Sequence, residues 1–277
     1  MTDPHSATNA DTDAALALLL AGRRWADPTL LEAGRRMVST IWARDVATVA
    51  GCPYVTAGDW AMTDTIVAVN PGYFSPYAYR IFAEVDPEHD WMGALDAGYR
   101  LLFDASQAPL GAAHSAGLPP DWVGVERADG ALIPLPLPAS DTTRYSDDAA
   151  RTYWRVALDL RWNRDGRAEA YLRQAGFLRD EVNRKGWVSA AYARDGTIGE
   201  EKPSVVGTTG AFAALLTLDP EVAQILYANQ LVGGAIHTGA RAYWGDPADL
   251  NAQAWGWFAV ALYADALPNL WHTPPGR

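Results

Sequence analysis

The sequence predicts an all-α fold built from paired helices, with short strands confined to loops. Segments with the helical spacing of apolar residues follow one another, without the strand–helix–strand alternation of a doubly wound sheet. These segments are rich in Ala and Gly and poor in charge, as expected where a helix packs against neighbours on two sides.

Taken in chain order, the helical spacing predicts roughly nine helices. They cover residues 12–25, 28–44, 76–84, 91–106, 145–162, 167–183, 204–216, 220–231 and 250–266. Pro28 stands at the first position of the second helix, where proline is favoured. A short loop containing Tyr243 and Trp244 precedes the last helix.

The predicted strands are short and fall between the helices. Candidate strands cover residues 46–49, 54–56 and 66–69. Asp129-Gly130 and Asp195-Gly196 are typical hairpin turns, and they predict β-hairpins within 121–135 and 186–202. The connections of about 30 residues are long by the usual loop statistics, so we expect them to line a site.

The composition narrows the class of ligand. The chain has 277 residues, 49% of them apolar, a net charge of −11 and a pI near 4.8. This acidity argues against nucleic acid, which needs basic patches, and suits an uncharged or basic ligand. The lone Cys52 excludes a disulfide framework and a Cys-based metal site, and the five His show no ligand spacing. We therefore expect no metal.

No membrane segment is predicted. No apolar run reaches the roughly 18 to 20 residues that a bilayer span requires. The apolar run at 14–21 follows acidic and polar residues rather than basic ones, so it does not have the pattern of a signal peptide. The 12 Trp and 12 Tyr suit contacts with sugar faces, although such rings are also common in cores.

The stretch 145–162, YSDDAARTYWRVALDLRW, carries the candidate chemistry at its amino-terminal end. Ser146 stands where an N-cap belongs, and apolar residues recur on one helix face behind it. Asp147 and Asp148 follow in the first turn, where the helix dipole favours negative charge, and Arg151 can pair with Asp148. An ionised carboxylate there suits a base that activates water. A capping cluster with a surface ion pair fits the same spacing, so both interpretations stay open.

Three stretches of the chain resemble glycoside hydrolase family 8, which contains endoglucanases, chitosanases and some xylanases. They are SATNADTDAALALLLAGRRW (6–25), NPGYFSPYAYRIFAEVD (70–86) and the stretch 145–162. The C-terminal AQAWGWFAVALY (252–263) is similar to the last core helix of that family. The four matches run in family order across nearly the whole chain, and together they are specific.

The resemblance implies a fold and an activity. The fold is an (α/α)6 toroid, with six inner helices ringed by six outer ones, in a single domain over residues 1–277. The activity is endo-acting, inverting hydrolysis of β-1,4-linked glycans, with no metal or organic cofactor. An inverting glycosidase needs an acid and a base roughly 6.5–9.5 Å apart, with water between the base and the sugar.

The resemblance also assigns roles to individual residues. Asp148 matches the general base of the family, and Arg151 matches the arginine beside it. Asn9 stands at the cleavage subsite, where the family usually has an aspartate, and Asp11 matches the second acidic position of that segment. From the residues alone, Asn9 also fits a turn or N-cap, and Asp11 fits a first-turn partner of the helix dipole.

Aromatic residues are the candidate sugar-stacking surfaces. Tyr73 and Phe74 lie in the second matching stretch and are expected to bind substrate. Packing in the core or in loops is the other interpretation for both, as it is for Trp122 and Trp187.

The departures from the family pattern concern the acid. Its glutamate, in a segment resembling S-E-G-Q-x-Y-G-M ahead of the 6–25 stretch, has no counterpart in this sequence. Asp147 occupies a place usually taken by tyrosine, and Asn251 falls near another. We expect a toroid that is incomplete at its N-terminus, with the acid encoded upstream. A natural short form, its hydrolysis reduced on the order of 10²–10⁴-fold or more, is the other possibility.

The leading functional prediction is therefore an endo-β-1,4-glucanase, with chitosan and xylan as other possible substrates. A non-catalytic glycan-binding or accessory protein on a degraded toroid is the alternative. An unrelated α/α toroid, such as a terpenoid cyclase, would need Asp-rich metal motifs that this sequence lacks. We expect a polysaccharide or oligosaccharide substrate, no nucleic-acid or membrane partner, a monomer, and a secreted or periplasmic full-length protein.

Overall fold

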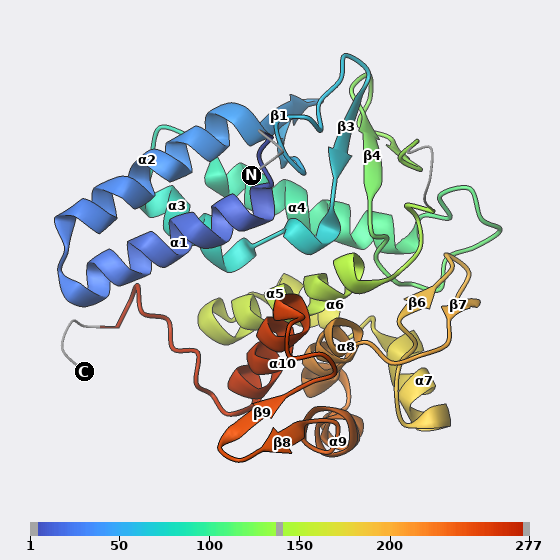
Figure 1. The fold of residues 1–277 in the computed structure, drawn as a ribbon. Helices are drawn as coiled ribbons and strands as arrows, with labels where there is room; N and C mark the ends of the chain where they lie inside the picture. The colour runs from blue at the N-terminus through green and yellow to red at the C-terminus, as the bar shows by residue number, and fades with distance from the viewer. Residues whose placement is uncertain (1–4, 137–140, 274–277) are drawn as a thin grey trace.

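The computed structural model describes residues 5–136 and 141–273 (Figure 1). Within these ranges the chain forms ten α-helices and four small antiparallel sheets. The helices are α1 (Thr8–Trp25), α2 (Pro28–Asp45), α3 (Pro76–Val85), α4 (Trp91–Gln107), α5 (Asp147–Asn163), α6 (Gly166–Leu172), α7 (Gly176–Lys185), α8 (Val205–Leu218), α9 (Pro220–Leu226) and α10 (Leu250–Tyr263). The predicted all-α fold with short strands in loops is confirmed.

The helices form an arc of pairs around a common core (Figure 1). Helices α1, α3, α5, α8 and α10 pack successively against one another, so they form the inner layer. Helix α2 packs on α1, α4 on α3, α6 on α5 and α9 on α8, so these helices lie outside. The central helix α5 is deeply enclosed in the arc, with ten of the eleven positions from Ala149 to Asp159 buried.

The strands are four short sets between the helices. They are β1 (Val46–Val49) with β2 (Cys52–Val55), β3 (Ile66–Val69) with β4 (Val123–Glu126) and β5 (Leu132–Ile133), β6 (Ala191–Tyr192) with β7 (Ile198–Glu200), and β8 (Ile236–Thr238) with β9 (Arg241–Tyr243). The two predicted hairpins are confirmed as β4–β5 and β6–β7. Gly130 and Gly196, in their turns, adopt the positive φ that glycine permits.

Three local predictions need correction. The single helix predicted over 167–183 is two helices, α6 and α7, because the chain turns between Leu172 and Gly176. The helix predicted over 220–231 continues beyond α9 as a π-helix, η2 (Tyr227–Val232). The loop predicted before α10 contains the β8–β9 hairpin, whose turn includes Gly239 at a φ of 62°.

The helix starts follow from local capping. Asp27 accepts the N–H groups of Thr29 and Leu30 at 2.8 and 3.3 Å, and Pro28 occupies the first helical position as predicted. Asp90 caps α4 in the same way, through the N–H of Gly93 at 2.8 Å. These side chains satisfy donors that have no partner inside a helix, which fixes where each helix begins.

An apolar groove of about 420 Å³ lies between α1 and α10, the two ends of the arc. Its wall includes Leu16 of α1, Trp154 of α5 and Trp257 of α10. In the described part of the chain, no helix is both long and apolar enough to cross a membrane.

Candidate active site

The candidate site lies where α5 begins, and Asp121 organises it. Ser146 is the N-cap residue of α5, as predicted, but its side chain accepts no hydrogen bond from the helix. Asp121 does so instead, from 28 positions earlier in the chain: its carboxylate accepts the N–H of Ala149 at 3.0 Å. The same carboxylate accepts the N–H of Ser146 at 2.9 Å and the hydroxyl of Ser146 at 2.5 Å. The expectation of a serine cap is therefore corrected to an aspartate cap from another element.

Asp121 is enclosed in this position. Only 4% of the residue is exposed, and Arg144 Nε donates to its second oxygen at 3.2 Å. Burial raises the pKa of Asp121, while the hydrogen bonds from Ser146 and Ala149 act in the opposite direction. Asp121 thus fixes the first turn of α5 through its hydrogen bonds, and its burial keeps it from contact with a ligand.

Asp148 follows in that first turn and remains partly open to solvent. Its side chain is 30% exposed, and Arg151 Nη1 lies 3.0 Å from its Oδ1, so the predicted ion pair forms. The guanidinium of Arg151 lies over the Trp255 ring, 5.8 Å from its centre, in a cation–π contact. A general base requires a carboxylate that is fixed in orientation and accessible to water, and Asp148 meets both conditions.

Asp147 joins α5 to α8. The hydroxyl of Ser204 donates to its carboxylate, and Ser204 also accepts the N–H of Gly207 as the N-cap of α8. Burial raises the pKa of Asp147, with Arg151 acting in the opposite direction. Two adjacent carboxyl groups therefore have different surroundings: Asp147 is tied to a neighbouring helix and Asp148 faces outward.

The short 3-10 turn η1 (Pro71–Tyr73) packs directly on this helix end. A Cβ atom built on Gly72 would lie 2.0 Å from the backbone oxygen of Asp148, so only glycine fits at this position. Asn70 accepts the N–H of Gly72 at 2.8 Å and caps the turn. Burial raises the pKa of Tyr73, and the charge of Asp148 raises it further. The turn that carries Tyr73 therefore lies beside the candidate base.

An aromatic row extends from Tyr73. Its ring lies 5.8 Å from the ring of Trp122, edge to face, and Trp122 lies 5.9 Å from Trp60. Trp60 is 42% exposed, so the outer end of the row is open to solvent. Exposed rings of this kind suit stacking on the faces of sugars. The sequence pattern does not single out Trp60, because this residue lies in a stretch without helical period.

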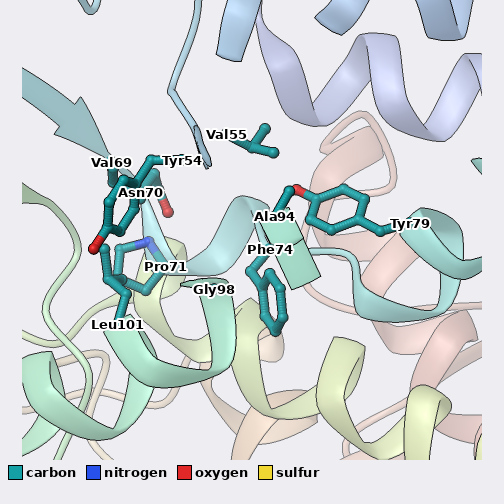
Figure 2. Close-up of a pocket in the computed structure, with 10 residues that line it drawn as sticks. All are labelled: Tyr54, Val55, Val69, Asn70, Pro71, Phe74, Tyr79, Ala94, Gly98 and Leu101. Carbon is teal, nitrogen blue, oxygen red and sulfur yellow. The ribbon is translucent and has the colours of Figure 1, made fainter. Parts of the chain in front are cut away.

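Phe74 has a different place from its neighbour. It is 7% exposed, and its ring packs edge to face on Tyr79 and Tyr99 in the core. It borders a cavity of about 20 Å³, large enough for a single water molecule (Figure 2). The structure thus gives Phe74 the packing role that the sequence had left open, while Tyr73 remains beside Asp148.

The predicted residues of α1 lie at its start. Asn9 is half-buried in the first turn, and Asp11 lies beside Arg44 and Asp59, whose charges act on it in opposite directions. Burial raises the pKa of Asp11, and likewise that of Asp45, whose carboxylate accepts the hydroxyl of Ser6 at 2.7 Å. Asp11 therefore belongs to an acidic group around the start of α1.

An ion pair between the buried Arg155 and the half-exposed Asp13 holds α1 against the arc. Arg155 of α5 donates to both carboxylate oxygens of Asp13, at 2.9 and 2.8 Å. The same guanidinium donates to Ser75 at 2.6 Å and to Tyr77 at 2.8 Å, so it joins α1, α3 and α5. Burial raises the pKa of Tyr77 to about 12.

The arrangement of Asp148 and Arg151 offers acid–base chemistry. Across residues 5–136 and 141–273, no three His, Cys, Asp or Glu side chains gather as metal ligands would. The structure brings Asp148, Arg151 and Tyr73 together. Asp121 and Ser204 were missed by the sequence analysis, because their contacts to α5 come from distant parts of the chain.

Comparison with known proteins adds family information. A family model described as Glycosyl hydrolases family 8 matches residues 1–179. Endoglucanase A of Acetivibrio thermocellus is 31% identical over 170 residues, 60% of this chain and 32% of that protein. Beta-glucanase of Niallia circulans is 27% identical over 214 residues, 76% of this chain and 50% of that protein. The chain therefore spans about a third to a half of the length of these curated relatives.

Solved structures share the fold. A beta-1,3-1,4-glucanase from Paenibacillus sp. X4 superposes with a TM-score of 0.77 at 22% identity, over 95% of this chain and 67% of that chain. An endo-1,4-D-glucanase from Vibrio fischeri ES114 gives a TM-score of 0.74 at 19% identity, over 95% and 71%. These neighbours are (α/α)6 toroids, and the arc of paired helices has that fold.

Proposed function

This chain belongs to glycosyl hydrolases family 8, and from that membership we propose that it hydrolyses β-1,4-glycosidic bonds in a polysaccharide with inversion. Asp148 is the general base: it takes a proton from a water molecule, whose oxygen attacks the anomeric carbon. Arg151 holds the carboxylate in position. The proposal rests on this ion pair, 3.0 Å long, which lies at the solvent-accessible start of α5.

The reaction also needs a carboxylic acid on the other side of the scissile bond, to protonate the leaving oxygen. The family likeness assigns this acid to a segment ahead of the 6–25 stretch. We therefore propose that residues 1–277 form one catalytic domain together with any such segment. The full-length protein is the material for the activity assays.

The substrate is proposed to be β-glucan. The names of the relatives, Endoglucanase A and Beta-glucanase, support this class of polymer. The row of Tyr73, Trp122 and Trp60 supplies flat surfaces beside the base, while Asn9 and Asp11 contact sugar hydroxyls. We propose a monomer that acts outside the cytoplasm, where such polymers are found.

The test is reducing-sugar release from carboxymethylcellulose, chitosan and xylan. Asp148→Asn is expected to lower the rate on the order of 10²–10⁴-fold, because the general base is lost. Asp180→Asn is the matched control, since Asp180 is exposed on α7 and pairs with Arg179. NMR of the first product is expected to show the inverted anomer. Tight oligosaccharide binding without any turnover by the folded full-length protein would contradict the proposal.

A further inference from the structure

Asn70 is a buried amide with hydrogen bonds completed on one side only. It is 1% exposed, and its Oδ1 accepts the backbone N–H of Gly72 at 2.8 Å. This bond fixes which way the amide is turned, because a backbone N–H needs the oxygen of the amide and not its nitrogen as the acceptor. The side-chain nitrogen, Nδ2, is enclosed and has no acceptor among the described residues. A buried donor without a partner is costly, so an acceptor for Nδ2 is expected here.

An enclosed cavity of about 20 Å³ lies beside this amide (Figure 2). Asn70 lines it, as does Tyr79 of α3, which is 1% exposed. Figure 2 shows the hydroxyl of Tyr79 directed towards Ala94 of α4. A cavity needs about 10–15 Å³ to hold a water molecule, which in turn needs two to four polar partners. The cavity therefore has room for one water molecule, and an amide nitrogen and a hydroxyl line it.

The amide belongs to the turn that supports the candidate base. Asn70 caps η1, and Gly72 within η1 packs so closely on α5 that a Cβ there would lie 2.0 Å from the backbone oxygen of Asp148. Phe74, which follows η1, lines the cavity and packs on Gly98 of α4, where a Cβ would lie 2.2 Å from its ring. The turn thus contacts both the cavity and the base, and a displacement of η1 changes the position of Asp148.

We propose that this cavity is a binding site for one ordered water molecule, and that Asn70, through this water and Gly72, is a positioning residue for Asp148. The water accepts a hydrogen bond from Asn70 Nδ2 and donates one to the hydroxyl oxygen of Tyr79. It therefore ties η1 to α3 and holds Gly72 against the first turn of α5. The positioning role rests on the proposed function, whereas the water site does not.

Two substitutions of Ala94 test the water directly, because Ala94 lines the cavity. Valine and threonine have nearly the same shape, so Ala94→Val and Ala94→Thr fill the space to the same extent. Only the threonine hydroxyl offers Asn70 Nδ2 an acceptor in place of the water. Crystal structures of the full-length protein and of both variants locate the water, and kcat and KM are measured on carboxymethylcellulose.

The expected result separates the two variants. The parent crystal shows one water molecule within hydrogen-bond distance of Asn70 Nδ2. Ala94→Val displaces this water and lowers kcat about tenfold, because the base is misaligned, while KM stays within about twofold. Ala94→Thr also displaces the water but retains most of kcat.

A second pair of variants removes the amide itself. Asn70→Ala is compared with Asn269→Ala, since Asn269 Oδ1 accepts the N–H of the residue two positions later, Trp271, at 3.1 Å. That turn lies at the other end of α3, where the indole of Trp271 donates to Glu84 at 2.7 Å. Both variants lose one turn-capping hydrogen bond, but only Asn70→Ala is expected to lower kcat, by about tenfold or more. This pair decides the positioning role if Ala94→Val does not fold.

The water site is overturned if the parent crystal holds no water in the cavity. The positioning role is overturned if Ala94→Val has the kcat of the parent, or if Ala94→Val and Ala94→Thr lose the same amount, which would show an effect of shape alone. Equal losses of kcat in Asn70→Ala and Asn269→Ala would also overturn it. If the folded parent is inactive on every glycan, the proposed function fails, and the crystal structures still decide the water site.

Discussion

Replacing Asp121 is expected to loosen the start of α5 more than any exposed change would. Its carboxylate accepts two backbone N–H groups and one hydroxyl, at distances of 2.5–3.0 Å, and only 4% of the residue is exposed. Hydrogen bonds to a charged group contribute about 1.5–3 kcal/mol each, but removing one partner rarely releases their full sum. Asp121→Ala is therefore expected to lower the free energy of unfolding by about 3–4 kcal/mol.

Asp121→Asn keeps one carbonyl oxygen as an acceptor, so about half of that loss is expected. The assay is urea denaturation followed by tryptophan fluorescence. The matched control is Asp129→Ala, because Asp129 also accepts a backbone N–H, that of Ala131 at 2.9 Å, but in an exposed turn. A change within about 0.5 kcal/mol is expected there. The reasoning is refuted if Asp121→Ala and Asp129→Ala have the same free energy of unfolding.

Three further predictions follow from single contacts. Gly72→Ala is expected to lower the free energy of unfolding by about 2–4 kcal/mol and to lower activity, since its Cβ would meet a backbone oxygen of α5 at 2.0 Å. Gly166→Ala, which has open space around its Cβ, is the control and is expected to be neutral or slightly stabilising in the same urea denaturation assay. Asp13→Ala leaves the buried guanidinium of Arg155 without its charged partner, and a loss of about 3–5 kcal/mol should appear in urea titrations; an unchanged midpoint would contradict the role of this pair. Asp147 has a raised pKa in the folded state, so its contribution to stability is complete below about pH 4 and declines as the pH rises through the folded value. In Asp147→Asn this decline disappears, which denaturation curves collected from acid to neutral pH would show by a flatter profile than that of the parent.

Local rules predicted the helices well because most starts and stops are encoded within a few residues. Asp27 and Pro28 define the start of α2, and the actual helix begins at Pro28. The start of α5 was also placed within two residues, at Asp147. The capping group was wrong, because Ser146 satisfies the local rule while Asp121 supplies the hydrogen bonds from a distant loop. Local sequence contains no information about the packing of the Asp121 loop against the start of α5.

Local sequence was also insufficient to distinguish the roles of Tyr73 and Phe74. Neighbouring residues in a tight turn direct their side chains to different sides, so two adjacent aromatic residues could not both face one site. The sequence could not decide which of them faces the site. The packing of Gly72 on α5 decides it: Tyr73 lies beside Asp148, and Phe74 packs between Tyr79 and Tyr99.

The convergence of helix starts explains how a chain with a net charge of −11 gathers carboxylates in one place. Ser204 at the start of α8 binds Asp147, Asp249 at the start of α10 acts on the same group, and the turn before α3 packs on Asp148. Each helix start presents the positive end of its dipole and its unpaired N–H groups. These three ends and the start of α5 itself together offset the repulsion between neighbouring aspartates. The starts of α5, α8 and α10 and the turn before α3 therefore share one end of the molecule, which is where Asp147 and Asp148 lie.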